Sequence, residues 1–248
     1  MTVSFWAKNG FSLLELSVVL VIVATVVGVS LSVGFQQTRI QQVSVSWSEL
    51  KKIKEVLRFH AQYYGKLPCP SSITLPDSDG NYGMAAEDCS DTSPPAGVTR
   101  VEFPPGNGTY VRIGAVPIRA LALPDDFISD AWGQRYFYAV SEDHIVSIDE
   151  DTDGVILIED GNGNTITDQA AFIIGTHGAT GRGAILHHNQ ALRKTCNTST
   201  ADSENCDITD SGQTADGVFS DAPFNDGDVS TSFFDDYVLW DTSRSALQ

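Results

Sequence analysis

The chain has 248 residues, of which 32 are Asp or Glu and 15 are Lys or Arg, so its formal net charge is −17. Its hydrophobic content of 42% is that of a folded protein and excludes a disordered acidic tail as a description of the whole chain. The acid excess leaves few of the clustered cations that phosphate backbones require, so no nucleic-acid partner is expected. The length allows one large domain or two modest ones.

The N-terminal part of the chain is strongly apolar. From Leu16 to Phe35 there is no charge and no proline, and a helix of this length reaches about 30 Å, the thickness of the hydrocarbon layer of a bilayer. A secretory signal peptide is an alternative, with Ser30 and Ser32 near a cleavage site. The apolar run is longer than in such peptides, Glu15 lies near its start and no polar break follows, so a membrane-spanning helix is favoured.

The helical pattern continues beyond this apolar run. The first proline is Pro68, so no obligatory helix breaker precedes it. Apolar residues recur at steps of three or four, namely Ile40, Val43, Trp47, Leu50, Ile53, Leu57, Ala61 and Tyr64. The pattern predicts one long helix whose second half packs against a domain. Residues 39–66 also carry more bases than acids.

The residues at the start of this helix carry a recognisable motif. Gly10-Phe11-Ser12-Leu13-Leu14-Glu15-Leu16, followed by an apolar run, resembles the prepilin cleavage and methylation signature of type IV pilins and pseudopilins. The resemblance implies that a prepilin peptidase cuts between Gly10 and Phe11 and methylates the new amine. It also implies that Glu15 pairs with the N-terminal amine of a neighbouring subunit. An unpaired carboxylate at membrane depth costs about 2.5–3.5 kcal/mol, so it needs a partner.

This resemblance suggests four segments. They are a leader at residues 1–10, a membrane-spanning half-helix at 11–35, an amphipathic half-helix at 36–64 and a head domain at 65–248. The expected fold is α+β and pilin-like, a long helix packed on an antiparallel sheet. Candidate strands, separated in several places by turn signals, are Tyr110–Ile113, Arg135–Val140, His144–Ile148, Val155–Ile158, Ala171–Ile174 and Tyr237–Trp240. A short helix is expected around Ile118–Leu123.

Within the head, three segments resemble parts of pseudopilin heads. Asp130-Ala131-Trp132-Gly133 and the aromatic run after it look like a turn followed by a strand. Two later segments look like late strands, Phe172-Ile173-Ile174-Gly175-Thr176-His177-Gly178 and Phe234-Asp235-Asp236-Tyr237-Val238-Leu239-Trp240.

The chain has four cysteines, all in the head domain. An exported head lies in an oxidising compartment, where disulfides persist. Proximity in sequence favours the pairs Cys69–Cys89 and Cys196–Cys206, and the other pairings stay open. Each bond would close an irregular loop and contribute about 2–4 kcal/mol. Zinc is the rival explanation, but no Cys-x-x-Cys spacing occurs.

Acidic loops are the candidate sites for chemistry. Asp149, Asp151, Asp153 and Asp160, with Gly154 at the sixth position, reproduce most of a calcium-loop pattern. Asp replaces the usual Glu at the twelfth position, and strand-like segments flank the loop. A second candidate runs from Asp160 to Asp168, and a third group comprises Asp226, Asp228, Asp235 and Asp236. Two interpretations stay open, a bound calcium ion or Asp-Gly-Asn turns that bind no cofactor.

No catalytic motif accompanies these loops. The five histidines lack a neighbouring nucleophile motif, and the glycine-rich run Gly178–Gly183 lacks the Lys-Ser/Thr ending of a phosphate loop, so no enzyme is expected.

The resemblance implies a pilin-like structural subunit of a type IV pilus or of a type II secretion pseudopilus, and the bulky head favours a minor subunit. Its partners would be prepilin peptidase, other pilin or pseudopilin subunits, an inner-membrane assembly platform and, before assembly, the lipid bilayer. It would lie in the bacterial inner membrane with its head in the periplasm, and later in a periplasmic pseudopilus or extracellular pilus. The alternative is a membrane-anchored periplasmic binding ectodomain that does not polymerise.

Overall fold

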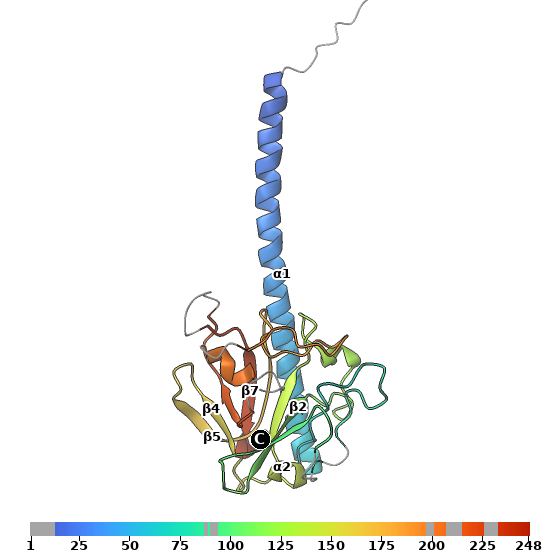
Figure 1. The fold of residues 1–248 in the computed structure, drawn as a ribbon, viewed down its shortest axis with the longest axis vertical. Coiled ribbons are helices and arrows are strands. Elements are labelled where there is room, and N and C mark those ends of the chain that lie inside the picture. The colour runs from blue at the N-terminus through green and yellow to red at the C-terminus, as the bar shows by residue number, and fades with distance from the viewer. Residues whose placement is uncertain (1–12, 87–88, 90–93, 197–200, 207–214, 226–232) are drawn as a thin grey trace, which may run out of the picture. The chain divides into compact units, whose positions relative to one another are not determined.

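A computed structural model describes residues 13–86, 89, 94–196, 201–206, 215–225 and 233–248, without the side chains of residues 28–37 and 201. The chain divides into two compact units, Met1–Gln42 and Val43–Gln248. Helix α1 (Leu13–Tyr64) begins in the first unit and ends in the second (Figure 1). Among the described residues, no helix combines the length and the apolar character that crossing a membrane requires. The prediction of a membrane-spanning half-helix is therefore wrong.

The second unit contains one seven-stranded sheet. Its strands are β1 (Thr99–Glu102), β2 (Tyr110–Ala115), β3 (Phe137–Ser141), β4 (Ile156–Glu159), β5 (Thr165–Thr176), β6 (Val218–Ser220) and β7 (Tyr237–Thr242). The strand order is β1-β2-β3-β5-β4-β6, and β7 also pairs with β5. The first half of the long strand β5 pairs with β4 and its second half pairs with β7. The short helices are η1 (Asp125–Ile128), α2 (Asp143–Val146), η2 (Ala201–Cys206) and α3 (Ser243–Ala246).

Three expectations about residues 65–248 are corrected. The sheet is mixed rather than antiparallel, because β4 and β6 run parallel, with Leu157 opposite Val218. It curls into a half-barrel. The candidate strand His144–Ile148 instead begins with the single turn α2, in which His144 is buried. The helix expected around Ile118–Leu123 is a series of turns, and a 3₁₀ turn follows at η1.

Both faces of the sheet are covered by apolar groups. On one face, Tyr138 and Phe172 pack with residues of α1 that are fully buried, namely Leu50, Ile53, Leu57 and Ala61. On the other face, Phe137 and Ile173 pack with residues from the later loops and strands, among them Ile185 and Phe219. Because both faces are buried, the central strands read as continuous apolar runs rather than alternating ones. The face of α1 expected to pack against a domain is confirmed from Leu50 to Ala61, whereas Ile40 and Tyr64, at the ends of the expected face, are exposed.

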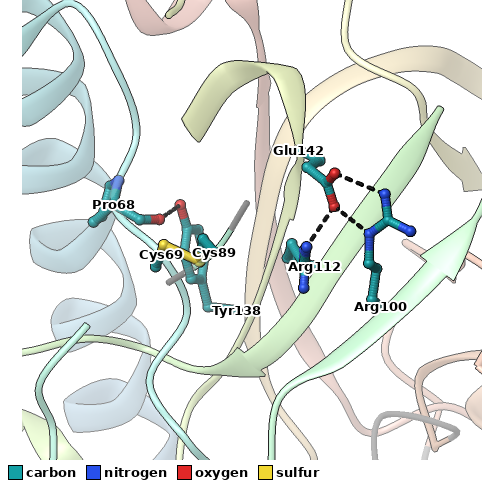
Figure 2. The surroundings of a disulfide bond; sticks show 7 residues. All are labelled: Pro68, Cys69, Cys89, Arg100, Arg112, Tyr138 and Glu142. Carbon is teal, nitrogen blue, oxygen red and sulfur yellow. Dashed lines mark hydrogen bonds and ion pairs between the residues drawn. A yellow bond between two sulfur atoms is a disulfide. The ribbon is translucent and has the colours of Figure 1, made fainter. Parts of the chain in front are cut away.

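Both disulfides expected from sequence proximity are present, Cys69–Cys89 and Cys196–Cys206. With all four cysteines paired, zinc has no thiolate ligand. Figure 2 shows the first bond beside Tyr138, whose hydroxyl donates to the carbonyl of Pro68 at 3.0 Å. This hydrogen bond fixes the segment that follows α1 against β3.

An ion cluster lies near the same bond (Figure 2). The Glu142 carboxylate accepts from Nε of Arg112 at 2.6 Å and from Nε and Nη2 of Arg100 at 2.7 and 2.9 Å. The Arg112 side chain is fully buried, so Glu142 supplies the charge that makes its burial tolerable. The cluster joins β1, β2 and the end of β3.

Candidate functional site

The predicted processing site begins outside the described part of the chain. Gly10 and Phe11 lie there, so their arrangement stays a prediction. Glu15 lies in the first turn of α1 and is exposed. A carboxylate at this end of a helix gains from the helix dipole. The pairing of Glu15 with a neighbouring amine also stays a prediction.

Two of the four predicted calcium-loop carboxylates, Asp149 and Asp160, hold turns. Asp149 Oδ1 accepts from the backbone N–H groups of Asp151 and Thr152, at 3.0 and 2.8 Å. The pKa of Asp149 is lowered. The largest cause is a hydrogen bond from the Thr152 side chain, and the backbone hydrogen bonds add to it. Asp153 Oδ2 accepts from the Gln169 amide at 2.9 Å.

Asp160 forms a second turn of the same kind. Its Oδ1 accepts from the backbone N–H groups of Asn162 and Asn164, at 2.8 and 2.9 Å. The pKa of Asp160 is lowered, mainly by the hydrogen bonds that it accepts from Asn164. The described structure does not gather Asp149, Asp151, Asp153 and Asp160 around one point, and these contacts favour the interpretation as turns.

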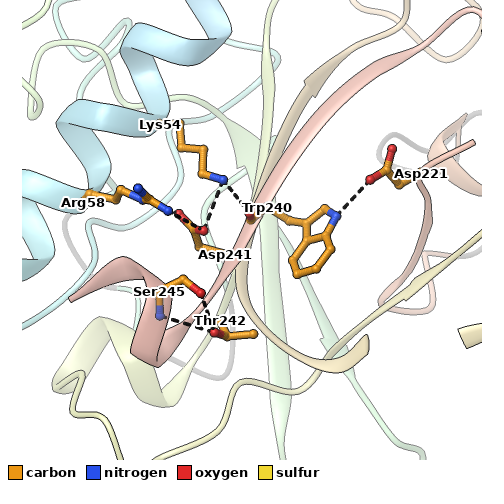
Figure 3. A network of polar contacts seen from close by, with 7 residues as sticks. All are labelled: Lys54, Arg58, Asp221, Trp240, Asp241, Thr242 and Ser245. Carbon is orange, nitrogen blue, oxygen red and sulfur yellow. Dashed lines mark hydrogen bonds and ion pairs between the residues drawn. The ribbon is translucent and has the colours of Figure 1, made fainter. Parts of the chain in front are cut away.

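Bases on α1 are used within the chain (Figure 3). Arg58 donates to both carboxylate oxygens of Asp241 on β7, and Lys54 donates to the carbonyl of Trp240 at 2.8 Å. Trp240 in turn donates from Nε1 to Asp221 at 3.0 Å. The strand β7 therefore fastens the C-terminal half of α1 to the sheet.

Three buried aspartates meet at a different place. The carboxylate oxygens of Asp202, Asp235 and Asp236 lie within 4.8 Å of one another, and each residue is no more than 4% exposed. Asp202 lies in η2, and the other two precede β7. Among the described residues, this is the one group of three or more His, Cys, Asp or Glu side chains close enough to share an ion. We call it the aspartate cluster.

The glycine-rich run supports this cluster. Thr180 donates from its backbone N–H and from its hydroxyl to Asp235, both at 2.8 Å. Gly178 has a φ of +56°, and a Cβ there would lie 2.0 Å from the Asp235 carbonyl oxygen. A side chain at this position is therefore excluded on both grounds. The glycine-rich run Gly178–Gly183, which lacks the features of a phosphate loop, thus packs closely against Asp235 and binds its carboxylate through Thr180.

Asp202 is positioned by a contact of its own with Arg182 and by the contacts of its neighbour Asn205. The guanidinium of Arg182 lies 3.5 Å from Asp202 Oδ2 and 4.9 Å from the centre of the Phe233 ring. In the same 3₁₀ turn, the Asn205 amide accepts from the backbone N–H of Ser220 at 2.9 Å and donates to its carbonyl at 3.0 Å. Asn205 thereby fixes η2 to β6, and with it the position of Asp202.

The environment of the cluster disfavours the state in which all three aspartates are ionised. Burial, then the charge of Asp235, raises the pKa of Asp202 to about 6. Burial, then the charges of Asp202 and Asp235, raises the pKa of Asp236 well above its ordinary value. Such a group needs a compensating partner, either a proton or a cation.

Sequence reasoning named only part of this cluster. Asp235 and Asp236 belong to the predicted C-terminal acidic group, whose other members, Asp226 and Asp228, lie outside the described residues. Asp202 was missed because it is remote in sequence and lies in a segment without apolar periodicity. The available signal was an Asp-Asp pair directly before an apolar strand, combined with a glycine-rich run.

No protein-family model, curated protein or solved structure matches this chain.

Proposed function

We propose that the chain is a pilin-like structural subunit, processed between Gly10 and Phe11 and assembled into a filament through its N-terminal helix. The observation that carries the proposal is the set Gly10, Phe11 and Glu15 in the sequence, of which Glu15 lies in the first turn of α1. A helix that merely anchors a protein has no need of this set.

Exposed apolar side chains on α1 support assembly. Among the described side chains of the first unit, Leu13 is 88% exposed, Leu14 73% and Val21 64%. Apolar surface of this kind is unfavourable in water and marks an interaction site. Packing against the helices of other copies would cover it, as a filament core requires.

Two disulfides support an oxidising compartment such as the periplasm. In that setting the proposed partners are prepilin peptidase, other pilin or pseudopilin subunits and an inner-membrane assembly platform. The proposed role is structural rather than catalytic. A bulky head with two disulfide-closed loops favours a minor subunit.

The proposal is tested by the mature N-terminus. The full chain is expressed in cells with and without prepilin peptidase, and intact-mass and N-terminal peptide spectra are recorded. We expect a chain that starts at N-methylated Phe11 only when the peptidase is present. A Gly10→Val variant should remain uncut, whereas a matched Asn9→Val variant should be cut. Retention of residues 1–10 beside an active peptidase would refute the filament role.

One observation favours the alternative, a periplasmic binding ectodomain that does not polymerise. A cavity of about 310 Å³ opens beside the Cys69–Cys89 loop. Its lining is mostly apolar and includes Leu75, Met84, Ala86, Pro95 and Ala96. Apolar clefts of this size accept small ligands. An uncut chain that stays monomeric and binds a small apolar molecule would support this alternative over the filament role.

A further inference from the structure

We propose that the aspartate cluster, Asp202, Asp235 and Asp236, binds one hard divalent cation. The three residues come from two separate segments of the chain, η2 and the approach to β7. A bound cation would cross-link these segments. The site is distinct from the loop of Asp149, Asp151, Asp153 and Asp160, in which the oxygens of Asp149 and Asp160 hold turns.

Carboxylate oxygens without partners carry the proposal. Within the described structure, neither Oδ1 nor Oδ2 of Asp236 has a hydrogen-bond partner, and Oδ1 of Asp202 has none. Asp236 is 4% exposed and Asp202 is 2% exposed, so bulk water does not compensate these oxygens. Buried carboxylates are expected to be paired or to coordinate a metal. The Asp236 carboxylate lies within 4.8 Å of those of Asp202 and Asp235.

The charges of the surrounding groups fit a divalent ion. Arg182 lies 3.5 Å from Asp202 and is the positive partner of the cluster in the described residues. Three carboxylates and one guanidinium leave two formal negative charges, which one divalent cation cancels. Arg182 alone is too distant from Asp202 for a strong charge-assisted hydrogen bond.

The donor set selects the class of ion. Each residue of the cluster supplies carboxylate oxygen, and neither a histidine nitrogen nor a cysteine sulfur belongs to it. Oxygen donors suit calcium, magnesium or manganese rather than zinc or copper. Asp235 is already fixed by Thr180, so the site is partly organised before an ion arrives.

A shared proton is the competing explanation. Two buried aspartates close to each other can hold one proton between them and so avoid repulsion. A proton-sharing pair needs no metal and gives no response to added divalent ions at constant pH. The two explanations therefore differ in a measurable way.

The experiment uses the purified full chain, treated with EDTA and dialysed. Calcium, magnesium and manganese chlorides are titrated separately by calorimetry at constant pH, and thermal melting is recorded with and without each salt. We expect at least one of these ions to bind with one equivalent per chain and to raise the melting temperature. Asp236→Asn should weaken that binding by more than about 100-fold, beyond the usual effect of a residue outside the ligand set.

Two controls keep the result interpretable. Asp151→Asn, a matched change on the exposed loop, should leave both affinity and melting shift unchanged. Asp236→Asn should melt at a higher temperature than the wild type in EDTA, because it removes an uncompensated buried charge; this shows that the variant folds. Absence of binding for all three ions, or equal binding by Asp236→Asn, overturns the proposal and leaves the shared proton.

Discussion

Arg58 and Asp241 form a two-pronged ion pair between α1 and the last strand of the sheet. The Nε–Oδ2 and Nη2–Oδ1 distances are 2.7 and 2.9 Å, and Lys54 lies 3.1 Å from the same carboxylate. Asp241 is buried, and among the described residues Arg58 and Lys54 compensate its charge. Two of the bases that the sequence concentrates in residues 39–66, Arg58 and Lys54, thus serve contacts within the chain.

Replacing Arg58 should therefore destabilise the fold. We expect Arg58→Met to lower the free energy of unfolding by about 2 kcal/mol, because it leaves the buried Asp241 with Lys54 alone and the Arg58 side chain is itself partly exposed. Urea unfolding of the full chain measures the change. The matched control is Lys52→Met, which removes the exposed Lys52–Glu55 pair and should cost about 0.5 kcal/mol or less. Equal effects of the two substitutions would contradict the assigned role of Arg58.

The Glu142 cluster predicts acid sensitivity. Burial alone would raise the pKa of Glu142, but Arg100 and then Arg112 together lower it below the ordinary 4.5. Because the folded pKa is depressed, the stabilisation is complete above pH 4.5 and is lost as the pH falls through the lower folded value. Melting temperature recorded against pH should show this loss in the wild type.

The matched substitutions are Glu142→Gln and Glu55→Gln. Glu142→Gln should reduce stability at neutral pH by about 3 kcal/mol, because Arg112 is fully buried, and should flatten the acid limb. Glu55→Gln, on the exposed face of α1, should leave the profile unchanged. An unchanged acid limb in Glu142→Gln would show that another group controls it.

Asp130 predicts the opposite dependence on pH. Burial raises its pKa to about 6, although the Thr176 hydroxyl and the backbone of Gln134 and Trp132 donate to it. A raised carboxyl pKa means that its contribution is complete below the unfolded value of 3.8 and is lost as the pH rises through about 6. Asp130→Asn, which carries no charge, should be more stable than the wild type at pH 7 by about 2 kcal/mol.

Melting curves between pH 4 and 7 test this effect of Asp130. The difference between wild type and Asp130→Asn should grow as the pH rises. Asp126→Asn, an exposed neighbour, should show no such growth. A difference that stays constant with pH would mean that Asp130 acts through packing rather than charge.

Sequence reasoning performed best where contacts are local or the pattern is strong. The apolar repeat containing Leu50 and Leu57 predicted the buried face of α1, and short spacing predicted both disulfide pairings. The β4–β6 pairing was missed because parallel strands join segments that are remote in sequence, and Val218–Ser220 is too short to show a period. The turn at His144 was misread because one helical turn and a short strand share the same apolar residues.

The candidate site shows the same limit. Asp149 and Asp160 fit a sequence template, yet both carboxylates are used by the backbone of their own loops. Asp202 fits no template, and only folding brings it beside Asp235 and Asp236. Spacing rules detect ligands within one loop and cannot detect ligands that tertiary contacts assemble.

Glu15 predicts a separation of processing from assembly. If Glu15 pairs with the amine of a neighbouring subunit, Glu15→Gln should leave cleavage after Gly10 intact. It should reduce assembled filament by about tenfold or more, because loss of about 1.4 kcal/mol per contact changes an equilibrium by that factor. Sheared-filament fractions and mass spectra measure the two quantities. Ser17→Ala, two residues further along the same helix, is the control and should assemble normally.

The last prediction links a disulfide to the aspartate cluster. Asp202 lies between Cys196 and Cys206 in the chain, and a Cβ on Gly183 would lie 2.9 Å from the Cys206 sulfur, so this bond packs against the run that cradles Asp235. If the cluster binds a cation, replacing both cysteines of this pair by serine should weaken binding by about tenfold or more, because ordering the loop then opposes binding. The Cys69→Ser, Cys89→Ser double variant removes the other bond and should keep the cation affinity while losing about 2–4 kcal/mol of stability. Equal affinity in both double variants would show that the Cys196–Cys206 bond does not position Asp202.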